Sequence, residues 1–297
     1  MNLKYLAIGG ALLLFLGLLY FGLRAGTGNS VGETLTPVEG FRHAHGMAAD
    51  ILDKDRLYIA THEGLYLLQE EKDLYRVGKN QDDLMGFSAH PKEAGVFFSR
   101  GHPAYGGNIG FQKTMDGGMT WRKVSNGLGG PADFHAMAIG WTDPERVYGF
   151  YGGRLQRSSD GGASWEYALG KVSPISLTTD PKEADTLYAA TESGLKVSQD
   201  GGDSWRSLSS ELEGGVVTVF ALNPHNSKSA LAFSTKLGGL GVSSDGGVTW
   251  KKVEENFSGT ILYLAFSPAV SEKVYALTDR NSLYRSLDGG STWEKLR

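Results

Sequence analysis

A turn-like pattern, Ser/Thr-x-Asp-Gly-Gly-x-Ser/Thr-Trp, recurs along this sequence of 297 residues and limits the folds that it can adopt. The copies are TMDGGMTW at 114–121, SSDGGASW at 158–165, SQDGGDSW at 198–205, SSDGGVTW at 243–250 and SLDGGSTW at 286–293. Successive aspartates of the pattern are 44, 40, 45 and 43 residues apart. A period in the forties indicates a repeat protein, in which each unit packs mainly against its neighbours.

Each repeat contains four short segments with the character of β-strands. The last repeat, from residue 259 onward, contains the runs ILYLAFS, KVYALT, SLYRS and TWEKL. These runs are rich in β-branched and aromatic residues and are bounded by Gly, Pro, Asp, Asn or Ser, as strands joined by turns are. Four strands in each repeat of this length are typical of one blade of a β-propeller.

The number of repeats predicts an all-β, six-bladed β-propeller over residues 34–297. Five blades carry the pattern, and residues 45–77 form a degenerate first blade in which QEEKDLY replaces it. The expected blades are 42–80, 81–130, 131–172, 173–214, 215–258 and 259–297. The segment TLTPVE at 34–39 is predicted to be an extra strand that covers or closes the ring at its seam.

The repeated pattern, called the Asp box below, is predicted to have a structural role. Gly-Gly supplies backbone angles that residues with a Cβ atom resist, the aspartate accepts backbone N–H groups, and the tryptophan packs between blades. The expected structural residues are Asp116, Trp121, Asp160, Trp165, Asp200, Trp205, Asp245, Trp250, Asp288 and Trp293.

The first 33 residues differ in character from the repeats. Residues 5–23, YLAIGGALLLFLGLLYFGL, hold no charged side chain, and a helix of this length spans about 28 Å, close to the thickness of a hydrocarbon core. We therefore predict a transmembrane anchor at 1–24, with a cleaved signal peptide as the alternative, and a flexible linker at 25–33. With this anchor we predict a single-pass protein of the cell membrane whose propeller lies on the extracytoplasmic side. The propeller is expected to be monomeric.

Composition narrows the classes of ligand. The formal net charge is −4 and no basic block is present, which argues against nucleic acid as a partner. Cysteine is absent, so the chain forms no disulfide and offers no thiolate to a metal or a substrate.

Histidines gather on one face of the predicted propeller. The segments before the first strand and after the second strand of a blade lie on the same face, here called the top face, and the Asp boxes lie on the opposite face. Five histidines fall on the top face of three consecutive blades: His43, His45, His62, His102 and His135. The other two, His90 and His225, follow first strands and belong to the opposite face.

Carboxylates accompany these histidines on the top face. Asp83, Asp133 and Glu63 are candidates for general acid–base catalysis, with Glu192 as a further carboxylate of this face. Imidazoles and carboxylates that converge at strand ends suit a divalent metal, for which His45, His62, His102 and His135 are the expected ligands. Arginines expected near this face could hold an anion: Arg42, Arg100, Arg154 and Arg280. The structural alternative is that these polar groups line a wet channel.

The Asp boxes resemble the BNR repeats of sialidases and other glycoside hydrolases, of the sortilin ectodomain and of photosystem assembly factors. The motifs HAHGMA, THEGLY, DLMGF, GHPAYGGNIGF and DFHAMA most resemble an uncharacterised bacterial group of glycosyl-hydrolase-like proteins. This resemblance implies a set of ligand-binding residues: His43, His45, His62, Asp83, His102, Asn108 and His135. FRHA departs from the Arg-Ile-Pro signature of sialidases, so their mechanism does not carry over.

Three classes of function stay open at this point. The first is a membrane-anchored propeller that binds a metal or another ligand on its top face, and the sequence favours it. The second is a glycoside hydrolase acting on a glycan, and the third is an assembly scaffold that binds a protein at the propeller rim.

Overall fold

The computed structural model describes residues 34–103 and 106–297. The predicted anchor and linker, residues 1–24 and 25–33, lie outside these residues. Among the residues described, none belongs to a helix that is long and apolar enough to cross a membrane.

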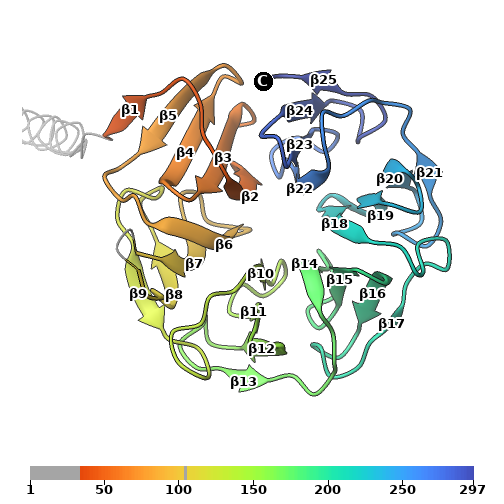
Figure 1. Ribbon diagram of the computed structural model, residues 1–297, viewed down its shortest axis with the longest axis horizontal. Helices are drawn as coiled ribbons and strands as arrows, with labels where there is room; N and C mark the ends of the chain where they lie inside the picture. Colours follow the sequence, from red (N-terminus) through yellow and green to blue (C-terminus); the bar gives the residue numbers. More distant parts are fainter. Residues whose placement is uncertain (1–33, 104–105) are drawn as a thin grey trace, which may run out of the picture. The chain divides into compact units, whose positions relative to one another are not determined.

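The described chain consists of six antiparallel sheets, and the predicted all-β, six-bladed propeller is confirmed (Figure 1). The first sheet contains β1 (Leu35–Pro37), β2 (Ala44–Ala49), β3 (Arg56–Thr61), β4 (Gly64–Gln69) and β5 (Asp73–Val77). The second contains β6 (Asp83–Ala89), β7 (Phe97–His102), β8 (Phe111–Thr114) and β9 (Arg122–Ser125), and the third β10 (Ala136–Ile139), β11 (Val147–Tyr151), β12 (Arg154–Ser158) and β13 (Glu166–Tyr167).

The remaining blades repeat the four-stranded order. They are β14 (Pro174–Thr179), β15 (Leu187–Thr191), β16 (Gly194–Ser198) and β17 (Arg206–Ser207); β18 (Val217–Asn223), β19 (Asn226–Ser234), β20 (Gly239–Ser243) and β21 (Lys251–Lys252); and β22 (Ile261–Phe266), β23 (Val274–Thr278), β24 (Leu283–Ser286) and β25 (Glu294–Lys295). The first full-length strand of each blade, β2, β6, β10, β14, β18 or β22, lies nearest the axis (Figure 1). Side chains from these six strands line a central cavity of about 220 Å³.

The Asp boxes form the turns between the third and fourth strands and join each blade to the one before it. In the fourth blade Asp200 accepts the Ser204 backbone N–H at 2.8 Å, and its other oxygen accepts the Ser204 hydroxyl at 2.5 Å. The second glycine, Gly202, has a φ of 98°, and a Cβ atom there would lie 2.5 Å from Leu155 of the preceding blade. A glycine is therefore required both by the turn and by the contact between blades.

The tryptophans of the boxes pack at these same junctions. Trp165 packs edge-on against Phe111 and Phe134, with ring centroids 5.4 and 5.2 Å away. The Trp165 indole N–H donates to the Gly162 carbonyl at 2.9 Å, and the same bond recurs at Trp205, Trp250 and Trp293. In the first box the buried Trp121 indole nitrogen has no hydrogen-bond partner among the described residues. The contacts of the boxes are thus internal to the fold.

We expect these turns to make the propeller sensitive to acid. Hydrogen bonds from the hydroxyl four residues on lower the pKa values of Asp160, Asp200 and Asp245 from 3.8 to about 2. A carboxyl whose pKa is lower in the folded state stabilises the fold above pH 3.8, and this contribution is lost as the pH falls from 3.8 to about 2. The midpoint of thermal unfolding should therefore drop through this range. In Asp200→Asn the drop should be smaller, and an unchanged acid dependence in that variant would contradict this account.

Within the described residues, the first and last blades exchange no strand where the ring closes. The predicted extra strand exists as β1, but it pairs antiparallel with β5, with Leu35 opposite Val77, so it covers the outer edge of the first blade. Apolar side chains close the seam instead. Ile59 and Leu68 of the first blade share a buried cluster with Tyr275 and Leu277 of the last.

A buried charge network reinforces this seam, and it uses the turn that replaces the Asp box in the first blade. Glu71 lies in that turn with a φ of 58°. Its carboxylate pairs with Lys273 at 2.7 Å and with Arg285, and it accepts the Tyr275 hydroxyl at 2.8 Å. Lys273, whose side chain is 4% exposed, also pairs with Asp55 at 3.0 Å. Burial acts to raise the pKa of Glu71, but the bonds from Lys273 and Tyr275 outweigh it and the pKa is lowered.

Candidate metal site

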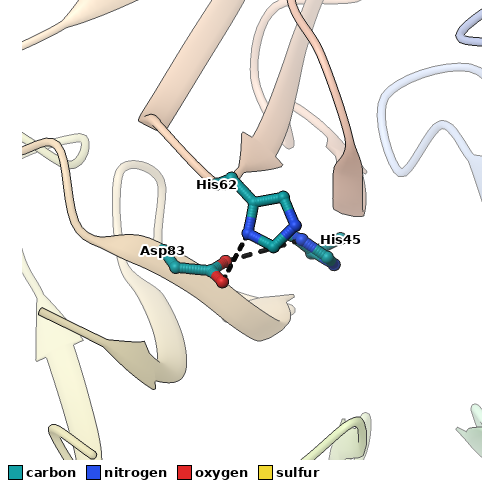
Figure 2. Close-up of side chains that lie close together, drawn as sticks. All are labelled: His45, His62 and Asp83. Carbon is teal, nitrogen blue, oxygen red and sulfur yellow. Dashed lines mark hydrogen bonds and ion pairs between the residues drawn. The ribbon is translucent and has the colours of Figure 1, made fainter. Parts of the chain in front are cut away.

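Two histidines of the first blade meet one aspartate of the second. His62, which follows β3, places Nδ1 2.5 Å from Oδ2 of Asp83, at the start of β6. His45 in β2 places Nε2 3.5 Å from Oδ1 of the same carboxylate. One donor atom from each of the three residues lies within 4.8 Å of the others. Figure 2 shows the two rings and the carboxylate facing one another.

The backbone explains why His45 reaches this position. The pairing of β2 with β3 shifts register between Ala44 and Gly46, so His45 is the extra residue of a β-bulge. Bulges redirect a side chain relative to the regular alternation of a strand. His43, two residues earlier, has a φ of 48°, in the left-handed region that a residue with a Cβ atom rarely adopts, and its carbonyl accepts the His62 N–H at 3.4 Å. Such strain is found where the surroundings impose a particular conformation.

The electrostatics of this group favour neutral imidazole at His45. Burial lowers the pKa of His45 from 6.5 to about 4, against the opposing effect of the Asp83 carboxylate. A ring with this pKa is neutral at pH 7, and the neutral ring is the form that binds a metal. The buried Nε2 of His45 and the buried Oδ1 of Asp83 make no hydrogen bond to any described residue and lie 3.5 Å from each other. Buried polar atoms without a hydrogen bond are costly, and a cation bound between these two would satisfy both.

A second group lies beside the first and has a similar composition. His102 at the end of β7 is the register partner of Asp83, and its Nε2 lies 2.9 Å from Oδ2 of Asp133. Nε2 of His135, an exposed residue just before β10, lies 3.4 Å from the same oxygen. The structure therefore divides the four histidines expected to share one metal into two pairs, each with its own aspartate.

His102 is held differently from His45. Its Nδ1 lies 2.8 Å from the Gly107 carbonyl and its Nε2 faces the Asp133 carboxylate, so both ring nitrogens face hydrogen-bond acceptors. The bond to Gly107 raises the pKa of His102, and Asp133 adds to that effect. A ring that donates from both nitrogens has no lone pair for a metal. In this arrangement His102 lies beside the group of His45, His62 and Asp83 and offers no free ring nitrogen to a metal.

A glycine between the two groups brings them close. Gly101 has a φ of 149°, and a Cβ atom there would lie only 1.8 Å from the Asp83 carbonyl oxygen. Any larger residue would push β7 away from β6, and with it His102 away from Asp83. The sequence GHP at 101–103 therefore needs its glycine for the packing of the site.

Arg100 does not lie where the sequence suggested. Its side chain is fully buried, with the guanidinium carbon 3.4 Å from the centre of the Phe134 ring, and it donates to the Ala132 carbonyl at 2.9 Å. Burial lowers the pKa of Arg100 to about 9, although Asp133 acts to raise it. The expectation that Arg100 holds an anionic ligand is wrong, because aromatic rings and backbone carbonyls enclose it. Its hydrogen bond to Ala132 instead holds the backbone next to Asp133 in place.

The other predicted residues have local partners. Asn108 donates to the Pro131 carbonyl at 2.8 Å and so ties the β7–β8 loop to the β9–β10 loop, which carries Asp133. Glu63 accepts the Tyr66 hydroxyl at 3.4 Å, and no contact joins it to either histidine group within the described part of the chain. The exposed His43 ring lies 5.3 Å from that of His62, centre to centre.

The remaining two histidines serve turns away from this site. Nδ1 of His90 accepts the backbone N–H groups of Lys92 and Glu93 at 3.2 and 3.0 Å. The aspartate at the same position of the fourth blade, Asp180, makes the equivalent bonds, so His90 caps a turn. His225 is exposed in the turn after β18.

Tyr263 is a residue of this face that sequence reasoning missed. It comes from β22 of the last blade, lines the central cavity with His45 and His135, and donates its hydroxyl to the Ala44 carbonyl at 3.1 Å. Burial raises the pKa of Tyr263 to about 12, and Asp83 contributes. Only the closed ring brings the last blade to the first, and the run ILYLAFS carries no local sign of it.

Comparison with known proteins places the fold among three kinds of propeller. The family model described as "Sortilin, neurotensin receptor 3" matches residues 238–297. A xyloglucanase of Hypocrea jecorina is 26% identical over 46% of this chain and 19% of its own length. The structure of a GH74 enzyme of Niastella koreensis matches with a TM-score of 0.63 at 16% identity, over 89% of this chain and 47% of that one.

YCF48 of Cyanidioschyzon merolae matches with a TM-score of 0.56 at 15% identity, over 88% of this chain and 87% of its own. Another YCF48 structure, with a TM-score of 0.50, was solved bound to D1 peptide. The chain spans less than half the length of the xyloglucanase and of the GH74 enzyme. The predicted similarity to glycosyl-hydrolase-like, sortilin-type and assembly-factor propellers is therefore confirmed, and at these identities the structural matches establish the fold alone.

Proposed function

We propose that this protein binds a divalent transition metal through His45, His62 and Asp83 on the top face of its propeller. We further propose that its N-terminal segment anchors the protein in the cell membrane, with the propeller on the extracytoplasmic side. One observation carries the proposal, namely that two imidazoles and a carboxylate from two blades present donor atoms within 4.8 Å of one another. A zinc ion with bonds of about 2.0–2.2 Å needs its ligand atoms roughly 3.3–3.5 Å apart. Small rotations of side chains would bring the three atoms to that spacing.

The donor set indicates the class of metal. Nitrogen and oxygen ligands suit zinc, iron, nickel and copper, whereas magnesium and calcium prefer oxygen alone. Two histidines and one carboxylate leave coordination positions open for water or an incoming ligand. The His62 side chain is 47% exposed, so those positions are accessible from solvent. A metal there could bind an external ligand or activate a water molecule.

A glycoside hydrolase is less well supported, in spite of the similarity to a xyloglucanase. Hydrolysis by two carboxyl groups needs one of them to carry a proton to the glycosidic oxygen, and apolar surroundings usually keep it protonated. Asp83 and Asp133 each face two imidazoles instead. Glu63 and Glu192 are exposed.

The proposed anchor has its own test, which is cell fractionation. It predicts that the protein is recovered from the membrane fraction, whereas release into the medium with a new N-terminus near residue 26 would identify a signal peptide.

Titration of the metal-stripped, full-length protein with Zn²⁺ tests the proposed metal site. We expect one tightly bound ion per chain. His62→Ala should weaken zinc binding by about a hundredfold, because it removes one of three ligands.

The matched control is His225→Ala, which removes an exposed histidine from a distant turn. This variant should bind zinc as the wild type does. Equal loss in both variants would indicate nonspecific binding by surface histidines. Absence of zinc binding in the wild type would reject the metal site itself.

A further inference from the structure

A second cavity lies on the outer part of the fourth blade, apart from the histidine groups. It has a volume of about 490 Å³ and lies between residues 171–173, which lead into β14, and the strands β16 and β17. Its lining includes Trp205 and two lysines, Lys171 and Lys196. Arg206 also borders the cavity, but it pairs in register with Val197, so its side chain lies on the other face of the blade from that of Lys196. Glu192 is the single carboxylate of the lining, so the wall carries a net positive charge in a protein of net charge −4.

Comparison with the other blades explains why this space is open. Lys196 occupies the same register position in β16 as Gln156 does in β12 and Tyr284 in β24. The Gln156 amide bonds both backbone groups of Leu128, and the Tyr284 hydroxyl accepts the Ser258 N–H at 2.8 Å. In those blades this side chain therefore holds the segment that leads into the first strand of the blade. Lys196 makes no such bond within the described chain, and the gap remains.

The two lysines of this cavity also lack partners. Lys171 and Lys196 form neither an ion pair nor a side-chain hydrogen bond with any residue that the structure describes. Arg157 on the neighbouring blade, in contrast, pairs with Glu166 at 2.7 Å and with Asp203 at 3.0 Å. A bound anion would give the half-buried Lys196 the partner that the described chain does not supply.

We propose that this cavity binds an anionic carbohydrate, a sugar ring that carries a carboxylate. The carboxylate would pair with Lys196, because charge-assisted hydrogen bonds are the strongest that such a site can offer. Trp205 packs against the blade core but is only partly buried and borders the cavity, where the rest of its ring would offer apolar surface to the C–H face of a sugar ring. Hydroxyl groups of Ser173 and Ser193 in the lining match the hydroxyl groups of a saccharide. The inference does not depend on the metal site.

The test is calorimetric titration of the full-length protein with three probes: trigalacturonate, which is acidic; maltotriose, a neutral trimer with the same linkage type; and inorganic phosphate. Trigalacturonate should bind with a Kd of about 1 mM or tighter, and the neutral trimer at least tenfold more weakly, on the order of one lost charge-assisted bond. Equal affinity for both trimers would overturn the role of charge. Phosphate binding as tight as that of trigalacturonate would show a simple anion site and overturn the role of the sugar.

Lys196→Gln introduces the residue that the third blade carries at this position, so it should fold normally, and it should lower trigalacturonate affinity by about tenfold. The control is Lys251→Gln, which removes the charge of an exposed lysine in β21 of the fifth blade, outside the cavity. The control should bind as the wild type does, and thermal unfolding should verify that both variants are folded. An equal effect of the two substitutions, or no trigalacturonate binding by the wild type, would overturn the proposal.

Discussion

Replacing Lys273 with methionine should lower the free energy of unfolding by about 3–5 kcal/mol, as the removal of one partner from a buried charge network does. The substitution preserves most of the side-chain volume but leaves Glu71 and Asp55 at the seam without their shared ammonium group. Because the first and last blades share no strand among the described residues, side-chain contacts hold one blade to the other there. Chemical denaturation of the purified protein measures the effect.

The matched control is Lys54→Met, because Lys54 pairs with the same aspartate, Asp55, but its side chain is 62% exposed. Exposed pairs contribute between zero and about 1 kcal/mol, so this variant should be nearly as stable as the wild type. If the two variants lose the same small amount of stability, the network at Lys273 does not hold the ring closed.

The second large effect is expected at the metal site. Asp83→Asn keeps the size of the side chain but removes the negative charge. Zinc affinity should therefore fall by about a hundredfold, which is about 2.8 kcal/mol at about 1.4 kcal/mol per tenfold. The charge matters because a carboxylate ligand offsets part of the charge of the ion. Zinc titration of the metal-stripped protein gives the ratio of dissociation constants.

Asp133→Asn is the informative comparison, since this aspartate also lies between two histidines. If the ion sits between His45, His62 and Asp83 as proposed, Asp133→Asn should change zinc affinity by less than about threefold, in line with an indirect effect. A larger loss in Asp133→Asn than in Asp83→Asn would place the ion in the second group and refute the assignment.

The fold could be predicted well because sequence patterns within each repeat determine its strands and turns. The Asp boxes and the strands between them recur at an almost constant interval, and each blade is defined by residues close together in sequence. The confirmed count of six blades follows from those intervals. The place of β1 was harder to predict, because TLTPVE could pair with the last blade or the first, and only packing at the β5 edge decides between them.

The sequence predicts which histidines and aspartates share the top face, but not which of them contact one another. Strand direction gathers His45, His62, His102 and His135 on one face, but it does not tell which aspartate each ring meets. That choice depends on the bulge at His45 and on the close approach of Gly101 to Asp83, neither of which has a distinctive local pattern. The prediction that Arg100 faces an anionic ligand fails for a related reason. The rings that enclose its side chain, Phe134 and Trp165, come from the next blade.

The most direct test of the metal site is a crystal structure of the zinc-loaded protein with anomalous diffraction data collected on both sides of the zinc absorption edge. The account predicts one strong anomalous peak about 2.0–2.2 Å from a ring nitrogen of His45, a ring nitrogen of His62 and a carboxylate oxygen of Asp83. A peak between His102, His135 and Asp133, or a fully loaded crystal without a peak at His45, would contradict it.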